Sequence, residues 1–317
     1  MRYTAKKIGT LLLTMLLVSA FTFFAFSLLS GDAAVKMLGT NATPERLAAL
    51  REELGLNRPL IERYWSWLTA FLHGDMGISY QYRMPVAQLI APRLRPTLTL
   101  AAMSFALIVL ISVPLGVVTA KYAGGLLDRI VTVLGQLFMS VPPFFTGILF
   151  TYVFGLVLRL FIPGVMPDWT VSKTQYLGYL FFPAVAIALP RIAMTVRLLH
   201  GCIMEEAQRD YVRTSMARGR SRGDILYRHV LKNTLVPLVT FLAMTVAELL
   251  AGSVVIEQVF SITGLGRLLV NSISNRDTYV VQAIVVILAF SVVVCNLAGD
   301  LIARRIDPRL SRGGGAK

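Results

Sequence analysis

The sequence predicts an all-α membrane protein in which six helices cross the bilayer. The chain of 317 residues is 56% hydrophobic and only 15% charged. Its mean hydropathy of +0.67 is too high for an ordinary soluble domain. A bilayer core of about 30 Å is crossed by about 20 helical residues, and six apolar segments qualify as spans.

Polar stretches separate the six predicted spans. Pro142-Pro143 interrupts the third span, and the fifth carries one acid, Glu248. Membrane helices tolerate proline where neighbouring helices and water re-satisfy the backbone, so we expect kinks rather than ends at the prolines of these spans. The predicted spans are 8–31, 96–120, 130–158, 174–190 with an extension past Arg191 toward Leu199, 233–256 and 278–299.

Lysine and arginine residues predict the orientation, because cytoplasmic loops carry an excess of them. Nineteen lie in the two termini and the even-numbered loops, whereas the two short loops on the opposite side hold four. The remaining eight of the 31 lie in the long first loop, where the rule has little force. We therefore predict that both termini and the polar segment 204–237 are cytoplasmic.

The N-terminal segment has two interpretations. Arg2, Lys6 and Lys7 before an apolar run are compatible with a secretory signal peptide or with an uncleaved span. The run is longer than a usual signal core, and no small-x-small site closes it before Gly31-Asp32. We therefore predict that residues 1–31 form the first transmembrane helix.

The rest of the chain divides into three predicted parts. Residues 32–95 form an extracytoplasmic loop, with one short helix at 44–54 behind Thr43 as N-cap and another at 59–72. In the second helix, Trp65 and Trp67 are suited to a membrane-interface belt. The other two parts are a five-helix core, 96–303, and a cytoplasmic tail, 304–317.

The segment 204–237 is a polar, basic stretch between the fourth and fifth spans. Helical spacing predicts one helix over 204–217. Gly219 and Gly223 are weak helix formers and predict where that helix stops. The expected unit is a helix, a glycine corner and a second helix.

The second helix of this segment is predicted to begin at Ser221, with Asp224 three residues further on as in a weak capping box. Pro237 marks the start of the next apolar run, since proline is tolerated in a helix's first turn. One interpretation of the whole segment is an amphipathic helix lying on anionic lipid. The glycine corner and near-balanced charge favour the other, a surface that meets another protein.

This segment resembles the cytoplasmic "EAA" loop of bacterial ABC-importer permeases, in the form of the dipeptide, oligopeptide and nickel branch. That branch shows D-Y-V-R-T-A-R-A-K-G, then H-x-L-R-N and a proline. This chain has D-Y-V-R-T-S-M-A-R-G from Asp210 to Gly219, followed by H-V-L-K-N from His229 and by Pro237. It departs at Ser215 and Met216, and it lacks the literal Glu-Ala-Ala of other branches.

Other stretches resemble the same branch, so that the resemblance covers nearly the whole chain. The first loop contains LGLNRPLIERYWSWL and HGDMGISY, and the last contains E-Q-V-F-S-I-T-G-L-G-R followed by N-R-D. In the last loop, we expect Gly264 and Gly266 to allow a tight turn before a short helix, 267–274. The tail Asp307-Pro308-Arg309 is also similar to the family.

The resemblance implies the fold of a type I ABC importer permease in the bacterial inner membrane, with no cofactor and no metal site. It implies four protein partners: a second homologous permease chain, two cytoplasmic ABC ATPase subunits and an extracytoplasmic solute-binding protein. Short peptides are the commonest cargo of such proteins, and nickel or another chelated metal is the alternative.

The resemblance also implies that the first helix of segment 204–237 lies in a groove on one ATPase. We expect Tyr211, Val212 and Ser215 to pack in that groove, and the arginines of the helix to make polar contacts. Gly219 permits the corner that follows. The predicted ATPase-coupling residues are Glu206, Arg209, Asp210, Tyr211, Val212, Arg213, Thr214, Ser215, Ala217, Arg218 and Gly219.

No catalytic motif accompanies these features. The sequence contains no G-x-x-x-x-G-K-[ST] loop, G-x-S-x-G elbow, H-E-x-x-H pair or dinucleotide fingerprint. We therefore expect a transporter subunit rather than an enzyme, with ATP hydrolysed by its partners. Three scattered histidines and two cysteines lack metal-site spacing. The net charge of +14 mostly flanks apolar runs, which favours a lipid bilayer over nucleic acid as its partner.

Glu248 lies within a predicted span, where a carboxylate costs about 2.5–3.5 kcal/mol unless it faces protein or water or is protonated. One hypothesis places it on the translocation path. The alternative is a helix–helix hydrogen bond or an ion pair with Arg191. A proton-coupled secondary transporter that uses Glu248 as its carrier is a further alternative. We interpret Arg197 as an anchor at the cytoplasmic end rather than a substrate ligand.

Overall fold

The computed structural model describes residues 2–29, 33–38, 43–53 and 55–306. Within these ranges the regular secondary structure is helical, apart from one isolated antiparallel bridge between Ile78 and Pro85. The predicted all-α class is confirmed. The predicted tail motif at 307–309 lies outside the described residues. The chain divides into two compact units, which we call the first unit (residues 1–97 with 263–291) and the second unit (98–262 with 292–317).

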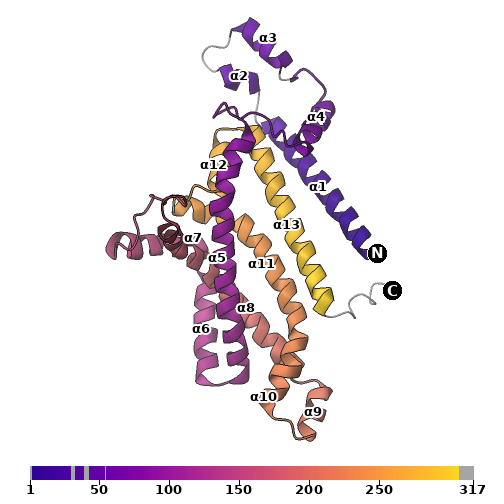
Figure 1. Ribbon diagram of the computed structural model, residues 1–317, viewed down its shortest axis with the longest axis vertical. Coiled ribbons are helices and arrows are strands. Elements are labelled where there is room, and N and C mark those ends of the chain that lie inside the picture. The colour runs from indigo at the N-terminus through magenta and orange to yellow at the C-terminus, as the bar shows by residue number, and fades with distance from the viewer. Residues whose placement is uncertain (1, 30–32, 39–42, 54, 307–317) are drawn as a thin grey trace. The chain divides into compact units, whose positions relative to one another are not determined.

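Five helices are long and apolar enough to cross a bilayer (Figure 1). The second of them, α5, begins ten residues before the predicted span, so residues 86–95 are helical rather than loop. Val86, Leu89 and Ile90 on this extension are buried, because they pack in an apolar cluster with residues of α12 and α13. The five helices are α1 (Arg2–Leu29), α5 (Val86–Lys121), α8 (Lys173–Glu206), α11 (Leu231–Val259) and α13 (Thr278–Ile306).

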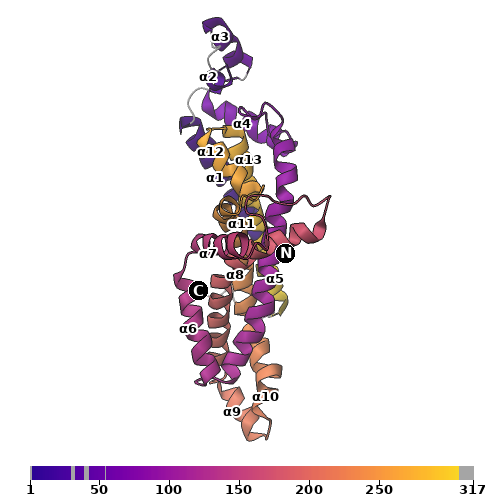
Figure 2. The same cartoon turned by 90° about the vertical axis from the view of Figure 1, so that its left-hand side faces the viewer.

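The predicted third span is broken in two. Helix α6 (Leu126–Ser140) is followed by α7 (Pro143–Phe150), which continues as the π-helix η2 (Thr151–Val157). The two arms meet at 95°, and Figure 2 shows α7 running across the direction of α6. Pro142 and Pro143 cause the break, because proline lacks an N–H and favours an extended preceding residue. The described residues give six spans when this bent pair is counted as one.

Helix α8 continues through Pro183 and Pro190 without a break. The Ser172 hydroxyl caps its start by accepting from the Gln175 N–H at 3.3 Å. Leu180, Ala184 and Ile187 belong to the main apolar cluster of the second unit, together with residues of α5 and α11. Small residues such as Ala184 allow membrane helices to approach closely, and the Ser104 hydroxyl donates to the Ala184 carbonyl at 3.3 Å.

The first loop contains three short helices: α2 (Ala33–Leu38), α3 (Pro44–Glu53) and α4 (Leu60–Leu72). Thr43 caps α3 as predicted, since its hydroxyl accepts from the Arg46 N–H at 3.3 Å. Trp65 is 51% exposed, but Trp67 is only 6% exposed, because it packs in a cluster with Phe23 and Tyr64. The expectation that Trp67 lies in an interface belt is therefore wrong.

The last loop contains the predicted short helix, α12 (Leu265–Ser274). Gly264 is its N-cap in an extended conformation, and Gly266 lies inside it, so of the two glycines expected to allow a tight turn only Gly264 precedes the helix, and neither has a left-handed backbone. Ser261 and Arg276 have that conformation instead, with φ of 55° each. These are uncommon angles for residues with a side chain.

Asp277 links the loop at 79–82 to the turn between α12 and α13 through hydrogen bonds. Its side chain is buried, and its carboxylate accepts from the Ser79 hydroxyl. It also accepts from the backbone N–H groups of Tyr80 and Gln81, each at 3.3 Å. The three donors satisfy a buried charged acceptor that would otherwise be costly.

We expect Asp277→Ala to lower the free energy of unfolding by about 3 kcal/mol, because it leaves buried donors without an acceptor. Denaturant titration of the protein in detergent measures this change. Ser274→Ala is the matched control, since its exposed hydroxyl donates only to the Val270 carbonyl one turn earlier, and it should cost less than about 0.5 kcal/mol. Equal effects of the two substitutions would contradict the role of Asp277.

Candidate functional site

The segment 204–237, which is the predicted coupling loop, is built around the buried carboxylate of Glu206, the last residue of α8. One oxygen, Oε1, accepts from Asn233 Nδ2 at 2.7 Å and from the Tyr211 hydroxyl at 3.0 Å. The other, Oε2, is 2.7 Å from Arg209 Nε. Because Asn233 belongs to α11 and Tyr211 to α9, this carboxylate ties three helices together.

The predicted helix over 204–217 is two helices in the structure. Helix α8 ends at Glu206, and α9 (Asp210–Ala217) starts after a three-residue turn. The ion pair between Glu206 and Arg209 spans that turn. Asp210 lies in the first turn of α9, where a negative charge is stabilised by the helix dipole. The expectation of one continuous helix is therefore wrong, and α9, which is the predicted coupling helix, is shorter than expected.

Gly219 forms the predicted corner after α9. Its φ is +81°, in the left-handed region that glycine adopts without penalty. The Gly219 N–H donates to the Met216 carbonyl at 2.9 Å, and the Arg220 N–H donates to the Ser215 carbonyl at 3.3 Å. These two bonds are those of a Schellman motif, which satisfies carbonyls at the end of a helix.

The second helix of the loop also begins as predicted. The Ser221 hydroxyl accepts from the Asp224 N–H at 3.1 Å and caps α10 (Arg222–Ile225). This helix runs through the π-helix η3 (Leu226–Val230) into α11. Gly223 therefore lies within a helix, and Pro237 lies in the interior of α11 rather than in its first turn. Figure 1 shows α9 and α10 at the end where α8 and α11 meet.

The inner face of α9 is occupied by this chain itself. Val212 is 1% exposed and packs in a cluster with Leu199 and Ile203 of α8 and with residues of α5, α10 and α11. The expectation that Val212 packs against an ATPase is corrected, because its surface is already buried. Tyr211 and Ser215 are half-buried, and the Ser215 hydroxyl donates to the Tyr211 carbonyl at 2.8 Å.

The outer face of α9 and its flanks carry the remaining predicted coupling residues. Arg209, Asp210, Arg213, Thr214, Ala217, Arg218 and Gly219 are all exposed. This face is predominantly basic, because three of the seven are arginines and one is an acid. A partner that meets it needs acidic or hydrogen-bond-accepting groups.

The Tyr211 hydroxyl stays protonated in this arrangement. Burial raises its pKa, and the hydrogen bond to Glu206 and the charge of Glu206 raise it further. A raised pKa keeps the hydroxyl as a donor throughout the physiological range. The bond between Tyr211 and Glu206 is therefore maintained at neutral pH.

Glu248 of α11 forms an ion pair with Arg191 of α8. This pairing was the alternative interpretation of Glu248, and the structure shows it. The two side chains are still 46% and 30% exposed, respectively. An exposed ion pair within membrane-spanning helices requires water or protein beside it, so this face is not an ordinary lipid-facing surface.

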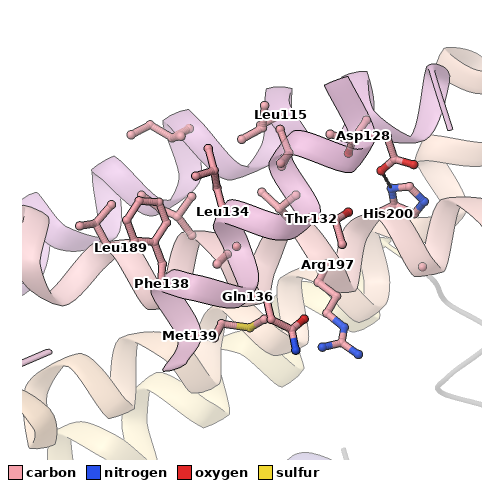
Figure 3. A pocket seen from close by; sticks show the side chains of 18 residues that line it. Leu115, Asp128, Thr132, Leu134, Gln136, Phe138, Met139, Leu189, Arg197 and His200 are labelled. Carbon is pink, nitrogen blue, oxygen red and sulfur yellow. Dashed lines mark ion pairs between the residues drawn. The ribbon is translucent and has the colours of Figure 1, made fainter. Parts of the chain in front are cut away.

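A cavity of about 590 Å³ lies between α5, α6 and α8 (Figure 3). At one end Asp128 Oδ1 is 3.5 Å from His200 Nδ1, which links the start of α6 to α8. Leu134, Phe138 and Leu189 line the opposite, apolar part. Arg197, the predicted anchor, also lines this cavity. Among the described residues, no group of three or more His, Cys, Asp or Glu side chains is placed to hold a metal ion.

Comparison with known proteins decides the family. Residues 112–312 match the family described as "Binding-protein-dependent transport system inner membrane component", and residues 1–101 match its N-terminal family. The chain belongs to this family of transport permeases. It is thus a multi-pass protein of the bacterial inner membrane, as the resemblance implied.

Relatives match the permease along nearly its full length. A probable peptide ABC transporter permease protein, y4tP, of Sinorhizobium fredii is 34% identical over 97% of this chain and 98% of the relative. A putative peptide transport system permease protein of Brucella abortus is 35% identical over 96% of this chain and 97% of the relative. The glutathione transport system permease protein GsiC of Pectobacterium atrosepticum is 34% identical over 98% and 99%.

A solved structure confirms the predicted permease fold. The inward-facing MetNI methionine ABC transporter contains a chain that matches this permease with a TM-score of 0.56 and 19% sequence identity. The match covers 69% of this chain and 96% of that chain. At this identity the likeness concerns the fold alone.

Sequence reasoning found most of the coupling loop but missed some of its contacts. Asn233 was recognised only as part of a motif, although its amide is the donor from α11 to Glu206. A contact of 2.8 Å between Arg220 Nη1 and His229 Nε2 was also missed. These contacts join residues 27 and nine positions apart, and no local pattern in the sequence signals pairs at such separations.

We expect Glu206→Ala to loosen α9, because it removes the acceptor shared by Asn233 and Tyr211. Losing a hydrogen bond to a charged group costs about 1.5–3 kcal/mol, so amides of α9 should exchange with deuterium about tenfold to hundredfold faster. Asn233→Ala should also make the amides of α9 exchange faster. The free-energy cost of the double variant should be less than the sum of the costs of the two single variants.

Gln208→Ala is the control for this prediction, since Gln208 is an exposed residue of the same turn. Hydrogen exchange followed by mass spectrometry measures the unaltered protein and all four variants. Exchange of α9 that is unchanged in Glu206→Ala would contradict the proposed role of its carboxylate.

Proposed function

We propose that this permease forms half of the translocation pathway of an ATP-driven importer of short peptides. The names of its relatives support a peptide as the cargo. These relatives are designated permeases for peptides and for glutathione, which is itself a short peptide. These names favour a peptide over nickel or another chelated metal. The other half of the pathway is a second, homologous permease chain.

The proposal gives each part of the chain a place. Residues 1–31 and 96–303 supply the spans, 32–95 the extracytoplasmic loop with the helical extension of α5 at 86–95, and 204–237 and 304–317 the cytoplasmic loop and tail. An extracytoplasmic solute-binding protein delivers the peptide. Two cytoplasmic ATPase subunits hydrolyse ATP, so the permease itself needs no catalytic site.

The observation that carries the proposal is the construction of α9. Its inner face is fixed to α8 and α11 through Glu206 and Val212, whereas its outer face is exposed and basic. An ATPase that binds the outer face therefore moves α9 as a rigid body. That movement is transmitted to the two membrane-spanning helices α8 and α11. ATP binding then biases a two-state equilibrium between inward-facing and outward-facing forms.

Gly219→Val should uncouple ATP hydrolysis from peptide uptake. The φ of +81° disfavours any side chain, at a cost of about 1–2 kcal/mol. A Cβ at this position would have no atom within 4 Å, so the effect arises from the backbone rather than from a clash. Uptake and ATPase activity of the assembled importer in proteoliposomes measure the coupling ratio, which should fall about tenfold.

Gly223→Val is the matched control for Gly219→Val. Gly223 also has open space around a Cβ, but it lies in a helix at an ordinary φ. The control should retain coupling. Normal coupling in Gly219→Val would contradict the proposed role of the loop. Peptide uptake that persists in the absence of the ATPase subunits would instead favour a secondary transporter.

Glu248 is proposed to lie on the translocation path. Because its ion pair with Arg191 is partly exposed between two spans, neutralising it should change the polar surface that the peptide meets. We expect Glu248→Gln to reduce ATP-driven uptake about tenfold while the ATPase rate is retained. Glu205→Gln is the control, because Glu205 is an exposed acid near the end of α8. Full uptake by Glu248→Gln would contradict the proposal that Glu248 lies on the translocation path.

A further inference from the structure

The first unit contains a polar cavity of about 350 Å³ that the transport mechanism does not use. Residues of α1, the end of α3, α4, the segment 75–80 and the start of α13 line it. These segments belong to the first loop, the last loop and the ends of spans beside them. The charge rule predicts that this region is extracytoplasmic.

Two buried polar atoms at this cavity have no hydrogen-bond partner within the described residues. They are Nε1 of Trp67, a donor, and Oε1 of Gln282, an acceptor. The residues are only 6% and 1% exposed, respectively, and both line the cavity. Buried polar groups are nearly always hydrogen-bonded, so both groups would gain a partner if their side chains turned toward a polar occupant of this cavity.

Charged side chains of both signs line the same cavity. Glu52 and Asp75 supply carboxylates, and Arg58 and Arg63 supply guanidinium groups. The ion pairs found among the described residues include none of these four. The charges balance, yet both signs remain available to a ligand. A simple anion or cation would meet two like charges as well as two opposite ones.

The wall of the cavity is fixed by close packing. The Gly77 N–H donates to Asp75 Oδ1 at 2.9 Å and orients that carboxylate. A Cβ on Gly77 would come within 3.1 Å of the Tyr279 ring, and its φ is +82°, so glycine is required there. Burial, followed by the influence of Tyr279, raises the pKa of Tyr80 well above its usual value. Tyr80 therefore presents a neutral hydroxyl.

We propose that this cavity binds a small zwitterion, a short peptide with free ends. Its carboxylate pairs with the arginines, its ammonium pairs with Glu52 and Asp75, and its amide groups meet Trp67 and Gln282. The site shares its class of ligand with the proposed function but does not depend on ATP or on the coupling loop. It would hold a peptide in the extracytoplasmic region before the peptide enters the spans.

Fluorescence of Trp67 tests the site directly. The full-length permease is purified in detergent with Trp65→Phe and Trp169→Phe, which leaves Trp67 as the remaining tryptophan of the three in the chain. Titration with alanyl-alanine should give a saturable change in emission. N-acetyl-alanyl-alanine amide, which lacks both charged ends, should give none. An equal response to both compounds, or no response to either, would overturn the proposal.

Arg63→Gln in the same background should weaken alanyl-alanine binding about tenfold, the usual effect of losing one charge-assisted contact. Arg46→Gln is the matched control, because Arg46 is an exposed arginine of the first loop outside the cavity. Thermal unfolding confirms that both variants are folded. If Arg63→Gln is not folded, Glu52→Gln takes its place in the test.

Equal binding by Arg63→Gln and Arg46→Gln would overturn the assignment of this cavity. ATP-driven uptake by the assembled importer is measured separately. If alanyl-alanine does not bind but uptake remains coupled to ATP, the further inference fails and the proposed function stands. If binding occurs but uptake is indifferent to ATP, the proposed function fails and the site stands.

Discussion

The coupling loop depends on one buried carboxylate, that of Glu206. A buried charge is tolerated only when its hydrogen bonds are satisfied, and here the donors come from Arg209, Tyr211 and Asn233. Each donor belongs to a different stretch of chain: the turn, α9 and α11. Satisfying Glu206 therefore requires that all three stay in place, which makes the end of α8, the coupling helix and the start of α11 one mechanical element.

The first unit also contains a buried carboxylate that accepts hydrogen bonds from another segment of the chain. Asp277 is buried, and its donors come from a loop almost two hundred residues earlier in the chain. In both units a carboxylate at a helix end organises backbone that apolar packing alone would leave free to vary. Apolar contacts hold the spans together, as in the cluster around Leu180 and Ile187, whereas the hydrogen bonds to Glu206 and Asp277 fix the chain between helices.

Hydropathy and motifs predicted the helical class, the spans, the glycine corner at Gly219 and the caps at Thr43 and Ser221, because these depend on local composition or on residues three positions apart. The errors have a common cause. The ten extra residues at the start of α5, the burial of Trp67 and the burial of Val212 all result from packing against distant segments. The three-residue turn before α9 was missed because the helical periodicity continues across it. The roles of Glu206 and Asn233 depend on a contact across 27 positions, which no local pattern encodes.

The central claim is that α9 moves together with α8 and α11. Spin labels on Thr214→Cys of α9 and Thr240→Cys of α11, with Cys202 and Cys295 replaced by serine, report this directly by pulsed electron resonance in the assembled importer. The account predicts one narrow distance distribution that is the same with and without ATP. A distribution that shifts or broadens when ATP binds would contradict it, because α9 would then move independently of the helix that it is proposed to drive.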